Sequence, residues 1–184
     1  MGELSFMGYL LDPVVVRAAG AAVSVVLLIG ALSKLKDNET FLYAVENYGF
    51  LQPTQAALFA RVFPLFELLA GVALLLAGIR EIGLLLGLVV LAVATGGVTT
   101  KLLQGHDRIE CGCGLGGQRI SWGLVVRNIV LVALMVLGAQ EGATRVLTLL
   151  DYFSVAALVL VLLAVYASAN QLLANQPLLK EIHS

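Results

Sequence analysis

The stretch IGLLLGLVVLAVATGGVTTKLL, at residues 82–103, decides the fold class of this chain. Its only charged residue is Lys101, close to its end. A run of about 20 apolar residues is what an α-helix needs to cross a hydrocarbon core of roughly 30 Å. The run is continuous and lacks the alternation of a barrel strand. Residues 82–103 are therefore predicted to form a transmembrane helix.

Four further stretches have the same character, at residues 13–33, 56–78, 121–139 and 147–168. Of the 184 residues, 60% are hydrophobic and only 12% are charged, too few for the surface of a soluble globule. We therefore predict an all-α integral membrane protein. It would be one domain covering residues 1–184, built as a bundle of about five transmembrane helices. A net charge of −1 and the lack of a basic patch argue against nucleic acid as a partner, leaving the lipid bilayer as the surroundings.

Local signals mark the ends of two helices. Asp12 before Pro13 is a good N-cap for the first span. Residues 36–49 carry apolar and aromatic side chains at helical spacing, which predicts a short amphipathic helix at the membrane interface between the first two spans. Gly49 and Pro53 are expected to end it.

The connection at residues 104–120 contains both cysteines of the chain, Cys111 and Cys113. Disulfides hold their Cα atoms roughly 4.4–6.8 Å apart, so a pair separated by one residue closes only in a compact turn. Glycines at positions 112 and 114 permit such a turn. Strained disulfides are usually labile and reactive rather than structural. Cys111 and Cys113 are therefore the candidate catalytic residues, and residues 104–120 the candidate redox loop.

A polar cluster is predicted on the same side of the membrane as this loop. In a bundle of five alternating spans, the ends of spans one and three and the starts of spans two and four share one face. Lys34 lies at that face, Arg127 and Asn128 lie within a few turns of it, and Glu67 lies near the membrane midplane. Charges at such depths are costly unless paired or hydrated. The cluster would support thiolate formation, since a nearby cation favours the thiolate. The alternative is an ion pair that only holds helices together.

Other groups in the loop bear on cofactors and proton transfer. His106 is a candidate proton acceptor, because imidazole exchanges protons near neutral pH. Two cysteines and one histidine fall short of a closed four-ligand metal site, so no metal site is predicted. The residues indicate no cofactor, and a quinone acceptor is compatible with the sequence without being shown by it.

Several motifs resemble the MauE family of methylamine utilisation proteins, within the broader DoxX-like membrane proteins. They are LLQGHDRIECGCG at residues 102–114, ISWGL at 120–124, VRN at 126–128, LSKL at 32–35 and PLFE at 64–67. The resemblance implies maturation of the disulfide-rich small subunit of methylamine dehydrogenase, together with a thioredoxin-like partner, MauD. It also implies a bacterial inner membrane protein.

The leading hypothesis is a membrane thiol–disulfide exchange protein that serves a client redox enzyme subunit. Two alternatives stay open: a non-catalytic membrane assembly factor, and a small transporter of soft metals or solutes. The side on which the loop lies is also contested. Disulfide chemistry favours the periplasm, and we take that as the expectation. The positive-inside rule favours the cytoplasm, because basic residues on the cysteine side (Lys34, Lys36, Arg61, Lys101, Arg108, Arg119, Lys180) outnumber those opposite (Arg17, Arg80, Arg145).

Overall fold

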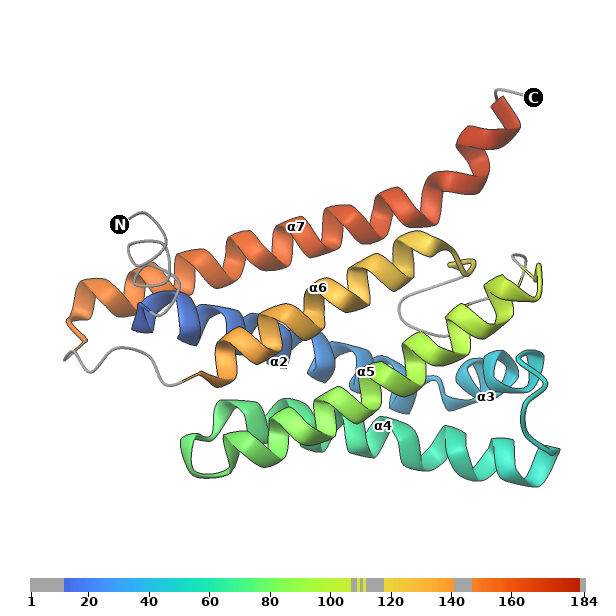
Figure 1. Ribbon diagram of the computed structural model, residues 1–184, viewed down its shortest axis with the longest axis horizontal. Helices are drawn as coiled ribbons and strands as arrows, with labels where there is room; N and C mark the ends of the chain where they lie inside the picture. The colour runs from blue at the N-terminus through green and yellow to red at the C-terminus, as the bar shows by residue number, and fades with distance from the viewer. Residues whose placement is uncertain (1–11, 107–108, 110, 112–117, 141–146, 183–184) are drawn as a thin grey trace.

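The computed structural model describes residues 12–106, 109, 111, 118–140 and 147–182 (Figure 1). Its helices are α2 (Pro13–Lys36), α3 (Asn38–Asn47), α4 (Pro53–Leu75), the short 3-10 helix η1 (Ala77–Ile79), α5 (Arg80–Leu103), α6 (Trp122–Ala139) and α7 (Leu149–Ile182). Five of them, α2, α4, α5, α6 and α7, are long and apolar enough to cross a membrane. The prediction of an all-α bundle, with one short helix between the first two spans, is confirmed.

The helix ends follow the local signals, with one exception. The Asp12 side chain accepts a hydrogen bond from the Val14 N–H at 2.8 Å and caps α2 as predicted. Gly49, at φ 62°, follows α3 as predicted. The exception is the last span, which was predicted at residues 147–168. Helix α7 begins at Leu149 and continues to Ile182, so Asn170, beyond the predicted end of the span, lies within the helix.

Helix α2 is the centre of the bundle. It packs against α4, α6 and α7, while α5 packs against α4 and α6. Small residues along α2, such as Ala18, Ala19 and Ala22, are almost fully buried and let its neighbours approach closely. The main hydrophobic core joins four of the spans through Val23, Leu27, Ala70, Leu74, Leu91, Leu131 and Met135.

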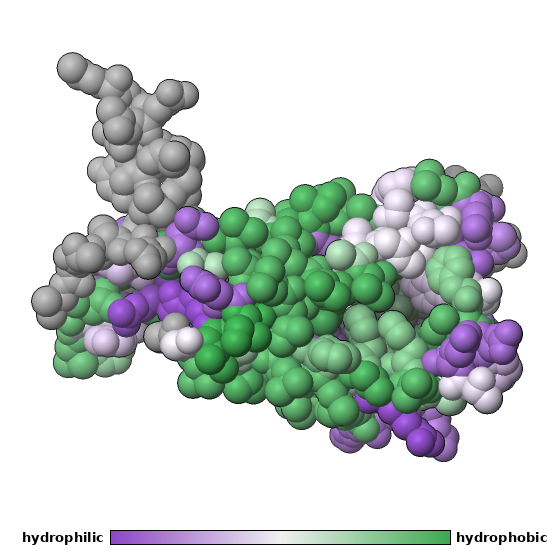
Figure 2. Space-filling model, turned by 60° about the horizontal axis from the view of Figure 1, so that its bottom comes forward, coloured by the Kyte–Doolittle hydropathy of each residue, from purple (hydrophilic) through white to green (hydrophobic). Residues whose placement is uncertain are grey.

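The outer surface suits a lipid environment. Figure 2 shows apolar side chains covering the middle of one face, with polar residues gathered toward both ends. In the most apolar stretch of α7 no residue is buried. Leu160, Val161 and Val165 are all more than half exposed. Because lipid chains solvate such side chains, this pattern indicates a helix at the bilayer boundary.

Helix α3 is held against α4 by a hydrogen bond that the proline at position 64 makes possible. Proline has no N–H, so the carbonyl of Ala60, four residues earlier, loses its partner within the helix. The Asn38 side chain, at the start of α3, donates a hydrogen bond to that carbonyl at 2.7 Å. Phe41 then stacks with Phe63 at a centroid distance of 6.1 Å. These contacts hold α3 against the end of the bundle that carries the cysteine loop.

Candidate functional site

The base of the cysteine loop is closed by two backbone hydrogen bonds. The Cys111 N–H donates to the Gln118 carbonyl at 2.7 Å, and the Ile120 N–H donates to the Ile109 carbonyl at 2.9 Å. The Tyr48 hydroxyl, at the end of α3, donates to the Cys111 carbonyl at 3.4 Å. The α2–α4 connection and the cysteine loop therefore lie at one end of the bundle, as the alternation of spans predicted.

Cys111 is buried as well as anchored. Its residue surface is 5% exposed, and it packs in a cluster with Val98, Ile120 and Leu124. Cys111 is disulfide-bonded. The other cysteine of the chain, Cys113, lies outside the described residues. The sulfur of Cys111 thus belongs to the interior of the protein and not to its polar surface.

Lys34 and Glu67 form a buried ion pair between α2 and α4. The Lys34 Nζ donates to the Glu67 Oε2 at 2.7 Å, and each residue is 7% exposed. Gly30, one turn before Lys34, makes room for the carboxylate: a Cβ at that position would lie 2.7 Å from Glu67 Oε1. The hydrogen-bonded partner of the Glu67 carboxylate is thus Lys34.

Arg127 and Asn128 form a second polar group, which connects α6 to α5 and α7. Arg127 donates to Asn128 Oδ1 from Nε at 3.3 Å and from Nη2 at 3.0 Å, and to Asn170 Oδ1 from Nη1 at 2.9 Å. Its guanidinium carbon lies 5.7 Å from the centre of the Tyr166 ring. Asn128 in turn donates to Thr95 Oγ1 at 3.0 Å. Three helices are thereby joined through the side chain of one arginine and its neighbour.

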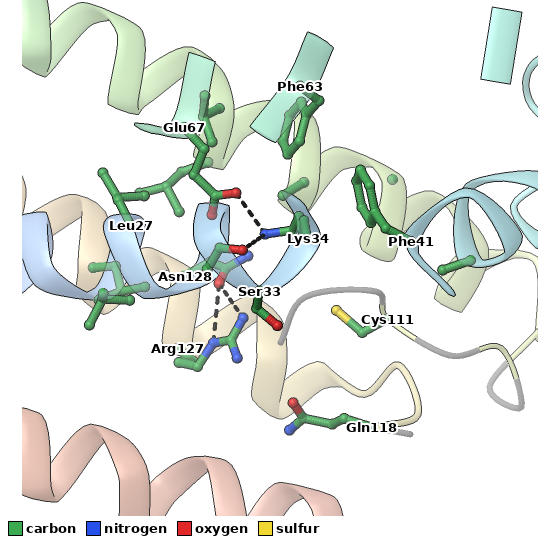
Figure 3. A pocket seen from close by; sticks show the side chains of 18 of the residues that line it. Leu27, Ser33, Lys34, Phe41, Phe63, Glu67, Cys111, Gln118, Arg127 and Asn128 are labelled. Carbon is green, nitrogen blue, oxygen red and sulfur yellow. Dashed lines mark hydrogen bonds and ion pairs between the residues drawn. The ribbon is translucent and has the colours of Figure 1, made fainter. Parts of the chain in front are cut away.

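One cavity connects these groups with the cysteine loop. Its volume is about 770 Å³, and Lys34, Glu67, Cys111, Arg127 and Asn128 all line it. Figure 3 shows the ion pair and the arginine group side by side, with the Cys111 sulfur pointing toward the same space. The predicted grouping of the polar cluster with Cys111 is thus what the structure contains. The chemical roles assigned to these residues stay predictions.

Tyr48 is the titratable group whose ionisation bears on the loop anchor. Burial raises the pKa of Tyr48 to about 12, from 10.0. Between those pH values the folded state keeps a proton that the unfolded state has released, so stability falls as pH rises. The contribution is complete below about pH 10 and is lost as pH approaches 12.

We therefore expect the melting temperature in detergent to fall more steeply above about pH 10 for the native protein than for a Tyr48→Phe variant. Thermal unfolding monitored at a series of pH values measures this. Tyr43→Phe is the matched control, because Tyr43 lies in α3, which Tyr48 directly follows, and is 70% exposed. It should follow the native curve. Parallel curves for the native protein and Tyr48→Phe would contradict the assignment.

The comparisons with known proteins identify the family of this chain. The family model described as methylamine utilisation protein MauE matches residues 12–141. The chain belongs to the MauE family. It is 31% identical to the methylamine utilization protein MauE of Paracoccus denitrificans over 68% of this chain and 69% of that protein. It is 32% identical to the methylamine utilization protein MauE of Paracoccus versutus, over 70% of this chain and 69% of that protein. No solved structure matches the chain.

The MauE match covers α2 to α6 and the cysteine loop, while α7 lies beyond it. Yet α7 supplies Asn170 and Tyr166 to the arginine group. Sequence reasoning missed both residues, together with Tyr48 and Gln118. One signal was available for α7: Tyr166 and Asn170 are four residues apart, so they share a helix face. Tyr166 lies within the apolar run of α7 and Asn170 lies just after it, and polar side chains on one face there indicate a face turned toward the bundle.

The remaining predicted site residue is His106. His106 is exposed and does not line the cavity. Its role as proton acceptor therefore remains a prediction without a contact to support it. Among the residues that the structure describes, no three of His, Cys, Asp or Glu are grouped as metal ligands. The family membership and the five apolar helices make this a multi-pass membrane protein.

Proposed function

We propose that this protein exchanges disulfides with a thioredoxin-like partner through Cys111 and Cys113. The observation that carries the proposal is that the disulfide-bonded Cys111 lines a cavity shared with the buried Lys34 and the half-buried Arg127. The resemblance to MauE proteins implies a MauD-like partner and, as client, the small subunit of methylamine dehydrogenase. We place the protein in the bacterial inner membrane, with its cysteine loop in the periplasm, where disulfides persist.

The exchange is written in two steps. A thiolate of the reduced partner attacks one sulfur of the Cys111–Cys113 disulfide, forming a mixed disulfide and releasing the other cysteine as a thiolate. The second thiol of the partner then displaces the bound cysteine. The partner leaves as a disulfide and this protein is left as a dithiol, having gained two electrons and two protons. The oxidised partner passes its disulfide to the client.

Burial decides which sulfur the partner attacks. Cys111 is 5% exposed and its backbone is fixed by hydrogen bonds to Gln118 and from Tyr48. A partner protein cannot bring its own sulfur into line with a sulfur that is enclosed in this way. We therefore assign the attack to Cys113, and Cys111 to the thiol that is released and later re-forms the disulfide.

The polar cluster would support this chemistry by charge. Arg127 is a cation on the cavity wall, and a cation favours the thiolate that Cys111 becomes on release. Asn128 and Asn170 fix the guanidinium in place by accepting three hydrogen bonds, which Nε, Nη1 and Nη2 donate. The Lys34–Glu67 pair keeps the adjacent wall polar while remaining neutral overall.

Single cysteine variants test the proposal and the order of attack together. With Cys111→Ser there is no internal disulfide, so the adduct forms in the reverse direction: the Cys113 thiolate attacks the disulfide of an oxidised partner and releases one partner thiolate. Cys111 is no longer present to displace the partner, so this mixed disulfide should accumulate. With Cys113→Ser, the buried Cys111 should yield little or no adduct. Non-reducing gels of native membranes, probed for a reducible adduct of higher mass, measure both. Equal adducts from the two variants would overturn the assignment of the attacked sulfur.

The double variant, Cys111→Ser with Cys113→Ser, separates exchange from assembly. If the protein acts by disulfide exchange, client disulfides should fail to form when both cysteines are absent. If the client still matures fully, the protein is an assembly factor and the cysteines are a structural clip. Failure of every cysteine variant to affect either adducts or client disulfides would overturn the exchange proposal itself.

A further inference from the structure

The cavity beside Cys111 is larger and more apolar than disulfide exchange requires. Its volume of about 770 Å³ falls within the roughly 300–1,000 Å³ typical of small-molecule sites. Beyond the polar cluster, its wall is formed by aromatic and aliphatic side chains, among them Phe41, Phe59, Phe63, Leu131 and Leu163. A protein partner that attacks the loop from outside makes no use of this space.

A hydrogen-bond donor beside the cysteine has no partner in the part of the chain that is described. The Gln118 Nε2 is buried and donates no hydrogen bond to an oxygen there. Gln118 lines the cavity, and its backbone carbonyl is bonded to the Cys111 N–H. In Figure 3 the side chains of Gln118 and Cys111 both extend from the loop toward Arg127. A buried unsatisfied amide is costly, and a carbonyl oxygen on a ligand would satisfy it.

The cavity therefore has two chemically different parts. One part offers N–H donors from Gln118 and Arg127 and the positive charge of Arg127, next to the disulfide-bonded Cys111. The charge of Lys34 in this part is neutralised by Glu67. The other offers an apolar wall. A fitting ligand has hydrogen-bond acceptors on a compact head and an apolar tail, and it arrives through the lipid. Quinones of the membrane have this form, with two carbonyl oxygens on a ring and an isoprenoid tail.

We infer that the cavity binds a membrane quinone, with its ring beside Cys111 and Gln118 and its tail along the aromatic wall. This inference rests on the proposed exchange function and supplies the oxidant that each cycle needs. The two S–H bonds of the reduced cysteine pair break and one S–S bond forms. The two electrons and two protons that are released pass to the carbonyl oxygens of the quinone, which leaves as quinol.

The test uses the full-length protein in lipid nanodiscs, reduced with dithiothreitol and freed of reductant without oxygen. Ubiquinone-1 is then added, and thiols are counted by maleimide labelling while quinol formation is followed by absorbance. One quinol per pair of thiols lost is expected. Gln118→Leu should raise the half-saturating ubiquinone-1 concentration roughly 2- to 10-fold, as expected for one neutral hydrogen bond. Gln104→Leu is the matched control, because Gln104 is exposed and lies outside the cavity wall.

The native protein keeps the two proposals distinguishable without any variant. Exchange with reduced thioredoxin, in the absence of any quinol formation, would overturn the quinone and leave the exchange function standing. Cysteines that react with neither thioredoxin nor quinone would overturn both. Binding alone is measured by the melting temperature, which ubiquinone-1 should raise with concentration. An equal rise with dodecane would show that the cavity takes any apolar chain, and would overturn the role of the ring.

Discussion

Replacing Glu67 by leucine is expected to lower the free energy of unfolding by about 3–5 kcal/mol, because the Lys34 ammonium would be left buried without its counter-ion. The two groups are 2.7 Å apart and each residue is 7% exposed. The backbone carbonyl of Gly30, at 3.4 Å from Nζ, is a weak substitute for a carboxylate. Denaturant-dependent unfolding in detergent measures the loss. Glu46→Gln, at an exposed position of α3, should leave stability unchanged.

The double variant, Lys34→Met with Glu67→Leu, is expected to recover most of that loss. A buried ion pair can often be replaced by apolar residues of similar volume at little cost, whereas removal of one partner is costly. A double variant as unstable as Glu67→Leu would contradict this account of the single variant. If the double variant is stable and, combined with Cys111→Ser, still forms the Cys113 adduct, the pair serves only to hold α2 against α4. If it is stable but the adduct is lost, the charges serve the thiols.

Gly30, Pro64 and Phe41 each contribute to the position of this ion pair. Gly30 provides the space for the carboxylate. Pro64 frees the Ala60 carbonyl that Asn38 bonds, so that α3 and Phe41 cover the pair. The Lys34 Nζ lies 5.7 Å from the centre of the Phe41 ring. A polar group deep in the bundle is thus enclosed by the same short helix that carries Tyr48 to the cysteine loop.

The fold was predictable because length and apolarity decide which segments cross a membrane. The five spans, the short helix near residues 36–49 and the Asp12 cap were all readable from local sequence. Alternation of the spans then placed Lys34, Glu67, Arg127 and Asn128 near the cysteine loop. This step needed no knowledge of side-chain packing, since it depends only on which membrane face each helix end reaches.

Contacts between helices far apart in sequence were not predictable in the same way. Asn170 contacts Arg127 only because α7 continues past residue 168 and presents Tyr166 and Asn170 to α6. The register between two apolar helices is set by packing along their whole length, and no local pattern records it. The unpartnered amide of Gln118 is a similar case, because it depends on how the loop closes on Cys111.

Replacing Gly138 by alanine is expected to destabilise the bundle by about 1–3 kcal/mol or more, as overpacking does where backbones are in contact. Helix α6 crosses α2 at this glycine. A Cβ on Gly138 would overlap the backbone N and Cα of Gly20, and no side chain can rotate away to relieve the overlap. Helices α2 and α6 would have to separate, which would weaken the packing of Met135 and Leu131 against Val23 and Leu27. Thermal unfolding in detergent measures this.

Two other glycines make the test specific to the crossing. A Cβ on Gly20 would lie 3.3 Å from the Gly138 carbonyl oxygen, so Gly20→Ala should cost clearly less than Gly138→Ala. At Gly96 a Cβ would meet no atom within 4 Å. Gly96→Ala should therefore be neutral or stabilise α5 by up to about 1 kcal/mol, through the better helix propensity of alanine. If all three variants melt alike, helix propensity and not the approach of α2 to α6 governs stability. Because the crossing lies near the start of α2 and Lys34 near its end, Gly138→Ala should loosen the bundle from the end opposite the cavity.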